Sequence, residues 1–180
     1  KVPELFLVEL PQTEAGWKMP GDAPLEGTDS SLPAPPRGVT QRRLTFTHAR
    51  RFPGLATVPR HWVRSNPQAT EIAFLMRDEA GIVQLWLISP QGGEPRQLTH
   101  HATGIQSAFN WHPSGKWLGC VVDNRIACCD ARSGEITFLT QNHGTPPSGD
   151  AVVFSPDGQF VAWMEDVDGF RQLWMTETGR

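Results

Sequence analysis

An internal repeat constrains the fold of this 180-residue chain more than any other feature. Each copy consists of an apolar segment, a turn that contains a proline, and a second apolar segment. The prolines are Pro67, Pro113 and Pro156, so successive copies begin about 45 residues apart. Repeats of this length with four short strands each are typical of β-propeller blades, in which neighbouring twisted sheets bury one another's faces. The sequence therefore predicts an all-β fold.

Turn chemistry divides the central copy into four strands. The segment 112–115, His-Pro-Ser-Gly, places proline and glycine where a β-turn favours them, and Asp123-Asn124 suits a two-residue hairpin. The apolar residues show no sustained period of 3.6, so helices longer than a turn or two are not expected. The expected strands of this copy are residues 108–111, 117–122, 125–130 and 136–140.

The copies together predict a partial β-propeller, with about three four-stranded antiparallel blades plus part of another. We expect these units to form one propeller domain that continues N-terminally of residue 1. The expected units are a partial blade at residues 1–60, complete blades at 61–107 and 108–150, and an incomplete last blade at 151–180.

Both outer units are expected to be incomplete. The first has strands at about 4–10 and 40–46, separated by a proline- and glycine-rich insertion at 11–38. We expect this insertion to be ordered only where its larger apolar side chains touch the body, namely Trp17, Leu25 and Leu32. The last unit lacks its outer strand, which leaves an unpaired edge at 172–175. Alone, the chain is therefore expected to pair with a second copy or to aggregate.

Composition argues against two classes of partner. A net charge of −3 gives no general attraction for nucleic acid, and the aromatic residues near the arginines, Phe46, Phe52 and Trp62, are expected to pack rather than to stack on bases. The apolar runs are far shorter than the ~20 residues that cross a bilayer. Tryptophans are expected to fill the space between blades at Trp62, Trp86, Trp111, Trp117, Trp163 and Trp174.

The cysteines are expected to be structural. Cys120, Cys128 and Cys129 are an odd number, which does not suit a disulfide framework, and all three lie in expected strands. We interpret them as small apolar residues. Their reduced state favours a cytoplasmic over a periplasmic location without deciding between the two.

Two segments carry a resemblance to a known superfamily. Residues 154–158 read Phe-Ser-Pro-Asp-Gly, and residues 92–99 read Gly-Gly-Glu-Pro-Arg-Gln-Leu-Thr. Both resemble the WD-like blade motif of TolB propellers, over about residues 62–180. The whole chain resembles the C-terminal part of an uncharacterised bacterial family of TolB-like propeller proteins. This resemblance implies the fold and a bacterial origin, but no reaction.

The superfamily is similar in fold and diverse in function. It includes the TolB propeller, which binds a lipoprotein partner, the propellers of prolyl-peptidase-type enzymes, and oligogalacturonate lyases that hold a divalent metal with histidines. The chain has no Gly-x-Ser-x-Gly elbow, so the peptidase chemistry is not expected in it.

The alternation of strand direction predicts a candidate site. Each loop from a fourth strand to the next first strand should share one end of the disc with the hairpins between second and third strands, at Arg77–Glu79, Asp123-Asn124 and Glu165-Asp166. Loops held on a rigid scaffold are frequent binding sites. The candidate ligand-binding residues in these loops are His48, Arg50, Arg51, His100, His101, Asn142 and His143.

Two functions are compatible with this loop-bearing end. The first is a non-catalytic binding or scaffold module for a protein partner or a small polar or acidic saccharide, with no catalytic residue and no certain cofactor. The alternative is a metal-assisted polysaccharide lyase of the oligogalacturonate type, with a divalent metal held by His100, His101 and His143. The other two histidines, His61 and His112, are expected to bond to backbone instead.

Arginines are concentrated between residues 42 and 64. They could recognise an acidic sugar or a carboxylate-rich partner through bidentate hydrogen bonds, or form a solvated and partly salt-bridged rim. The members are Arg42, Arg43, Arg50, Arg51, Arg60 and Arg64.

Overall fold

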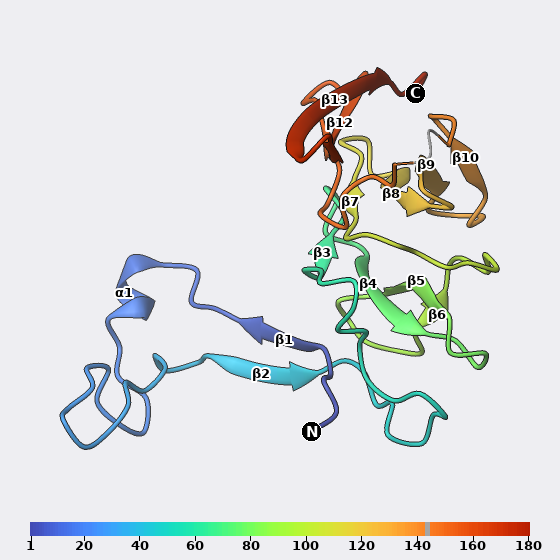
Figure 1. Cartoon of the computed structure of the whole chain (residues 1–180). Coiled ribbons are helices and arrows are strands. Elements are labelled where there is room, and N and C mark those ends of the chain that lie inside the picture. The colour runs from blue at the N-terminus through green and yellow to red at the C-terminus, as the bar shows by residue number, and fades with distance from the viewer. Residues whose placement is uncertain (143–144) are drawn as a thin grey trace.

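The strands form four antiparallel sheets, of which the last three lie side by side in chain order and the first extends away from them as a two-stranded ribbon (Figure 1). This computed structural model describes residues 1–142 and 145–180. The fold class expected from the repeat is confirmed. The second sheet contains β3 (Arg64–Ser65), β4 (Ile72–Arg77), β5 (Val83–Ile88) and β6 (Arg96–Gln97). The third contains β7 (Asn110–Trp111), β8 (Trp117–Val122), β9 (Arg125–Asp130) and β10 (Ile136–Phe138).

The outer sheets have fewer strands. The last sheet contains β11 (Val153–Phe154), β12 (Phe160–Val167) and β13 (Phe170–Glu177). The first contains only β1 (Phe6–Glu9) and β2 (Thr40–Arg43). The single helix of the described residues, α1, covers Glu14–Trp17 and is capped by the Thr13 side chain. None of the helices in these residues is long and apolar enough to cross a membrane.

The hairpins follow from residues that tolerate positive φ. Asp123 and Asn124 have φ of 49° and 56°, and they join β8 to β9 so that Val122 pairs with Arg125. Asp168 and Gly169, with φ of 52° and 82°, join β12 to β13 in the same way. Two-residue hairpins of this kind require positive φ at both central positions, which favours asparagine, aspartate and glycine.

The core lies between neighbouring sheets. Successive side chains of a strand point to opposite faces. In β8, Cys120 and Val122 therefore face the second sheet, where they join the cluster that contains Leu75 and Leu85. Val121 faces the last sheet and packs with its Val161 and Trp163. The third sheet is thus buried on both faces.

One hydrogen bond recurs where the outermost strand of each complete sheet ends. The Thr99 hydroxyl accepts the backbone N–H of Leu85 at 2.9 Å, and the Thr140 hydroxyl accepts that of Ile126 at 3.0 Å. The Thr45 hydroxyl accepts the N–H of Leu5 in the same way at 2.9 Å. This third bond shows that the β1–β2 pair ends in the same way as the third and fourth strands of the two complete sheets.

The insertion does not pack on the sheets. It extends away from them beyond the β1–β2 ribbon (Figure 1), and Leu32 is 91% exposed. Its contacts are internal, such as Arg37 N–H to Met19 O at 2.9 Å and a bridge between Pro20 and Pro36. Trp17 is also exposed. The expectation that Trp17 and Leu32 would touch the body is wrong, because the insertion closes on itself through its own backbone.

Aromatic packing matches the expectation in part. Trp86, Trp111 and Trp163 are buried. Trp62 and Trp174 are exposed, so the expectation that both are buried between blades is wrong. Trp62 lies in the segment before β3, and Trp174 lies on β13, the outermost strand of the last sheet. Phe46, also expected to pack, is exposed beneath the Arg43 guanidinium, whose carbon lies 4.7 Å from the ring centroid.

The cysteine prediction is confirmed. Cys120, Cys128 and Cys129 are free and buried in β8 and β9. Burial raises the pKa of the Cys128 thiol to about 11 and that of Cys129 to about 12. Thiols with such pKa values remain protonated near neutral pH and are poor nucleophiles.

We expect Trp111→Ala to lower the free energy of unfolding by about 3–5 kcal/mol, because the mutation leaves a large cavity. Trp111 is only 7% exposed, and its Nε1–H donates to Arg64 O at 2.9 Å. Urea denaturation followed by circular dichroism would measure the loss. Trp174→Ala is the matched control, and a similar loss in both variants would contradict the assignment of Trp111 to the core.

Candidate functional site

The loop before β3 and the β4–β5 hairpin meet at one end of the second sheet. Arg50 donates to Arg77 O at 3.0 Å and pairs with the Glu79 carboxylate at 3.3 Å. Arg51 donates to Glu79 O at 3.4 Å. Two of the predicted site residues therefore hold the hairpin in place. Their contacts agree with the expected sharing of this end by loops and hairpins.

A second group of polar residues surrounds Asp123 in the β8–β9 hairpin. Thr103 donates to its carboxylate at 2.6 Å, and His101 Nε2 lies 3.5 Å from the other carboxylate oxygen. Arg125 approaches that oxygen at 3.4 Å, and Asn142 donates to Asp123 O at 3.4 Å. We call these five residues the Asp123 cluster. It joins residues from two loops and one hairpin.

The Phe138 ring of β10 packs against two members of the Asp123 cluster, Arg125 and His101. The Arg125 guanidinium carbon lies 3.3 Å from the centroid of the Phe138 ring, and the His101 ring meets it edge-on with centroids 6.3 Å apart. Hydrogen bonding by Thr103 lowers the pKa of Asp123, and the nearby charges of His101 and Arg125 lower it further. The cluster therefore presents an ionised carboxylate at neutral pH.

Sequence reasoning found part of this cluster. It named His101, Asn142 and the hairpin but missed Thr103 and Arg125. Thr103 lies two residues beyond the predicted pair His100-His101, and Arg125 directly follows the Asp123-Asn124 turn. Their positions in the sequence, next to a predicted histidine pair and next to a predicted turn, were a usable signal.

The other predicted residues do not converge on one point. His48 is exposed, and His100 is exposed with its Nδ1 3.0 Å from the Gln97 amide nitrogen. His101 is instead engaged with Asp123. His143 lies outside the described residues. Within 1–142 and 145–180, no group of three or more histidine, cysteine, aspartate or glutamate side chains could hold a metal ion. The metal site stays a prediction.

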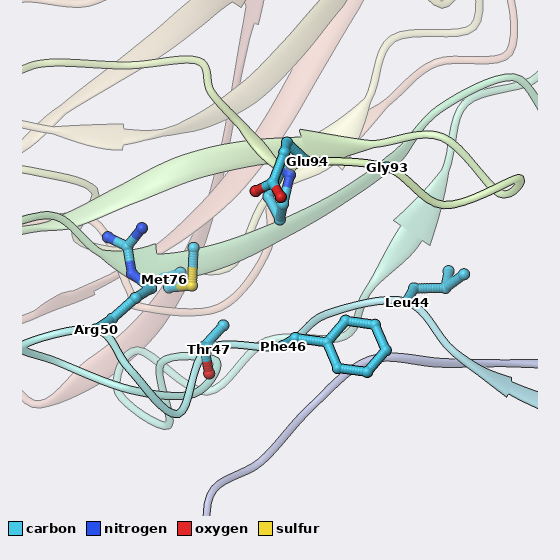
Figure 2. Close-up of a pocket in the computed structure, with 8 residues that line it drawn as sticks. Leu44, Phe46, Thr47, Arg50, Met76, Gly93 and Glu94 are labelled. Atoms are coloured by element: carbon cyan, nitrogen blue, oxygen red, sulfur yellow. The ribbon is translucent and has the colours of Figure 1, made fainter.

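The arginines between residues 42 and 64 are divided among several places. Arg42 donates to Pro90 O and Gln91 O, and Arg43 pairs with the Glu4 carboxylate at 2.8 Å. Arg50 lines a small pocket of about 160 Å³ beside Phe46 and Glu94 (Figure 2). Four of the six arginines thus bind neighbouring segments, which matches the partly salt-bridged rim rather than one basic surface.

The remaining two predicted histidines have structural roles. His112 is buried, with Nε2 3.0 Å from Gly158 O. His61 Nε2 accepts the backbone N–H of Leu75 at 3.1 Å. The expectation that both bond to backbone is confirmed.

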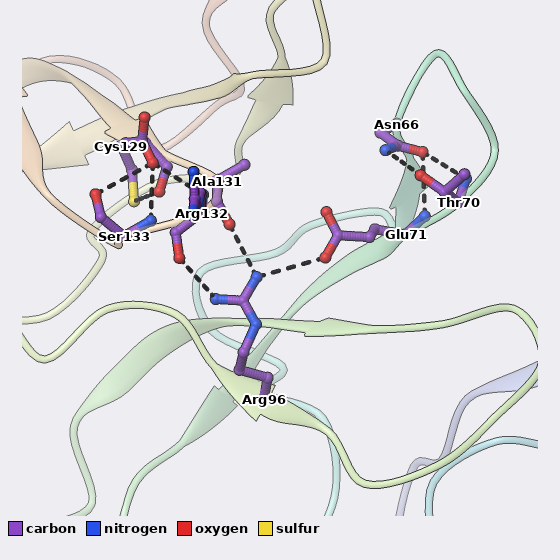
Figure 3. Close-up of polar contacts among 9 residues, drawn as sticks. Asn66, Thr70, Glu71, Arg96, Cys129, Ala131, Arg132 and Ser133 are labelled. Atoms are coloured by element: carbon purple, nitrogen blue, oxygen red, sulfur yellow. Dashed lines mark hydrogen bonds and ion pairs between the residues drawn. The ribbon is translucent and has the colours of Figure 1, made fainter.

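The opposite end of the sheets is held by Arg96. Its guanidinium donates to Ala131 O at 2.9 Å and to Arg132 O at 3.4 Å, and it pairs with Glu71 at 3.4 Å (Figure 3). Arg96 therefore links the turns of two neighbouring sheets.

Comparisons with solved structures show that the chain belongs to the class of TolB-like β-propellers. The structure of a putative TolB from Agrobacterium tumefaciens is 26% identical with a TM-score of 0.52, and the match covers 64% of this chain and 41% of that one. TolB from Acinetobacter baumannii is 21% identical with a TM-score of 0.59, covering 77% and 32%. A structure of a nidogen–laminin complex matches in fold, at 11% identity and a TM-score of 0.56, covering 77% and 49%.

Within this class, the chain is a homologue of the protein YidR of Escherichia coli K12, which is described as uncharacterized. The two are 74% identical over all 180 residues. The chain spans 42% of the length of that relative. No protein-family model matches the chain.

We expect Thr103→Val to raise the pKa of Asp123, because the largest cause of its lowered value is the Thr103 hydrogen bond. Because the pKa of Asp123 is lower in the folded state than its ordinary value of 3.8, the carboxylate stabilises the folded protein at pH values above 3.8. This stabilisation is lost as the pH falls through the pKa of the folded state. Carboxyl ¹³C NMR titration measures the change. Thr137→Val, an exposed position in β10, is the control. An unchanged Asp123 pKa would contradict the assigned hydrogen bond.

Proposed function

We propose that the chain is a non-catalytic binding and scaffold segment of a TolB-like propeller, which engages a protein partner at its loop-bearing end. The observation that carries this proposal is the Asp123 cluster, in which loop and hairpin side chains converge on one carboxylate. One solved structure that matches in fold is that of a nidogen–laminin complex, so this fold occurs in a complex of two proteins, which supports a protein partner. His100 and His143 are further proposed contacts.

The chemistry of the cluster suits polar recognition. The side chains of His101, Asp123 and Arg125 are largely shielded by neighbours but keep exposed fractions of 25%, 32% and 29%. Side chains already held by partners lose little conformational entropy when another protein binds them. The hairpin that carries Asp123 and Arg125 belongs to a sheet that is buried on both faces, so the surface is preorganised.

The residues that the structure describes provide no observation in favour of the lyase alternative. Its metal would require three converging ligands. Two of its proposed ligands, His100 and His101, bond to different neighbours, and the third is His143, for which no position is described.

Affinity capture with quantitative mass spectrometry tests the proposal. Bait proteins would be the wild type, a loop-end triple variant His101→Ala/Asp123→Ala/Asn142→Ala, and a control Lys116→Ala/Arg132→Ala from the opposite end. We expect one bacterial protein to be enriched by wild type and control, and to fall about tenfold or more with the triple variant. Equal capture by all three baits would contradict a binding site at the loop-bearing end.

We propose in addition that the rest of the propeller, or a second copy of the chain, covers the bare face of the last sheet. The pairing of Ala162 with Met175 and of Met164 with Leu173 puts these four side chains on one face. Leu173 is 76% exposed, and Val153 beside Ala162 is exposed as well. The β13 strand has no partner strand beyond β12 within the part of the chain that the structure describes.

We therefore expect the isolated chain to form dimers or larger species, and Leu173→Glu/Met175→Glu to shift it toward monomer. Apolar faces of this kind are buried in native assemblies. Multi-angle light scattering measures the mass of each species. Leu32→Glu, on the exposed insertion, should leave the assembly unchanged. A wild-type chain that stays monomeric at high concentration would contradict the proposal.

A further inference from the structure

A pocket of about 410 Å³ lies where the innermost strands begin. Its walls come from three segments that directly precede or open β3, β7 and β11, so it faces the axis side of the sheets. A hydrogen bond from Ala108 N–H to Gly149 O, at 2.8 Å, ties two of these segments together. The lining residues are Arg60, Trp62, Arg64, Ala108, Asp150 and Ala151.

Within the part of the chain that the structure describes, neither guanidinium group of this pocket has a hydrogen-bond or ion-pair partner. Arg64 Nε is buried and has no hydrogen-bond partner among residues 1–142 and 145–180. Arg60 lies over the Trp62 ring, with its guanidinium carbon 5.6 Å from the centroid. Leaving a buried N–H without a partner is costly, so native proteins usually satisfy it. The arginines of the rim, such as Arg42 and Arg43, do have partners.

The other polar group of the lining does not neutralise these arginines. Asp150 accepts a hydrogen bond from the Ser148 hydroxyl at 2.8 Å, and its ion pair at 3.9 Å is with Arg171. The Trp62 side chain is 67% exposed although it is large and apolar. The pocket therefore combines two available cationic forks, an exposed aromatic face and a hydrogen-bond acceptor.

We infer that this pocket binds a small ligand that carries a carboxylate beside a ring. A guanidinium fork matches the two oxygens of a carboxylate, and an exposed indole offers a face on which a ring can stack. Asp150 would accept a hydrogen bond from a ligand hydroxyl. The cavity volume lies within the usual range for small-molecule sites. This inference rests on the proposed function in one respect: both place a ligand at the loop-bearing end of the sheets.

Sugar acids and aromatic acids both supply this chemistry, and calorimetric titration distinguishes them. The probes are glucuronate against glucose, and 4-hydroxybenzoate against 4-hydroxybenzyl alcohol. We expect saturable binding of at least one acid and none of its neutral counterpart. Each of Arg60→Ala, Arg64→Ala and Trp62→Ala should weaken that binding by about tenfold or more.

The control is Arg132→Ala, which removes the same charge from the opposite end and should leave the affinity unchanged. If circular dichroism shows that Arg64→Ala does not fold, the affinity of Arg60→Ala tests the inference instead, because Arg60 is exposed and its replacement should not disturb the fold. No saturation by either acid up to about 10 mM, or equal binding of acid and neutral probe, would overturn the inference. Loss of partner capture by the loop-end variant with acid binding retained would support the pocket separately from the protein-binding function.

Discussion

Apolar contact between neighbouring sheets is the interaction on which the rest of the structure depends. Each central strand is short, and a single sheet cannot bury its two faces alone. In β8, Val121 packs toward the last sheet while Cys120 and Val122 pack toward the second. Burying side chains of this size contributes about 1.5–3 kcal/mol each, so the neighbours of a sheet supply most of its stability.

This mutual burial also positions the functional groups. Strands that are packed on both faces hold their hairpins and loops in fixed places, and side-chain bonds then connect one loop to the next. Arg50 with Glu79, and His101 with Asp123, are two such connections at the loop-bearing end. On the axis side, the same geometry leaves the buried Arg64 Nε without a partner among residues 1–142 and 145–180. Arg50 Nε also lacks a partner among the described residues, but the rest of that guanidinium is bonded to the β4–β5 hairpin, whereas Arg64 lines a pocket.

Local chemistry predicted much of the fold and part of the site. Turn residues located the strands of the central sheet, and alternating strand direction correctly placed His101 and Asn142 beside the Asp123 hairpin. The same reasoning failed for Trp62 and Phe46, because residue type predicts burial only when a neighbouring surface is present to cover the side chain. It also failed for the insertion, which bonds to itself.

The sequence by itself determined the repeat, the strands and the end of the disc at which loops gather, because turn preferences and the period of two act within a few residues along the chain. Only the tertiary structure decided which arginines are already paired, which aromatic rings are covered, and how Thr103 and Arg125 complete the Asp123 cluster. These outcomes depend on contacts between segments far apart in the chain, whose distances and directions are set by the packing of one sheet against the next.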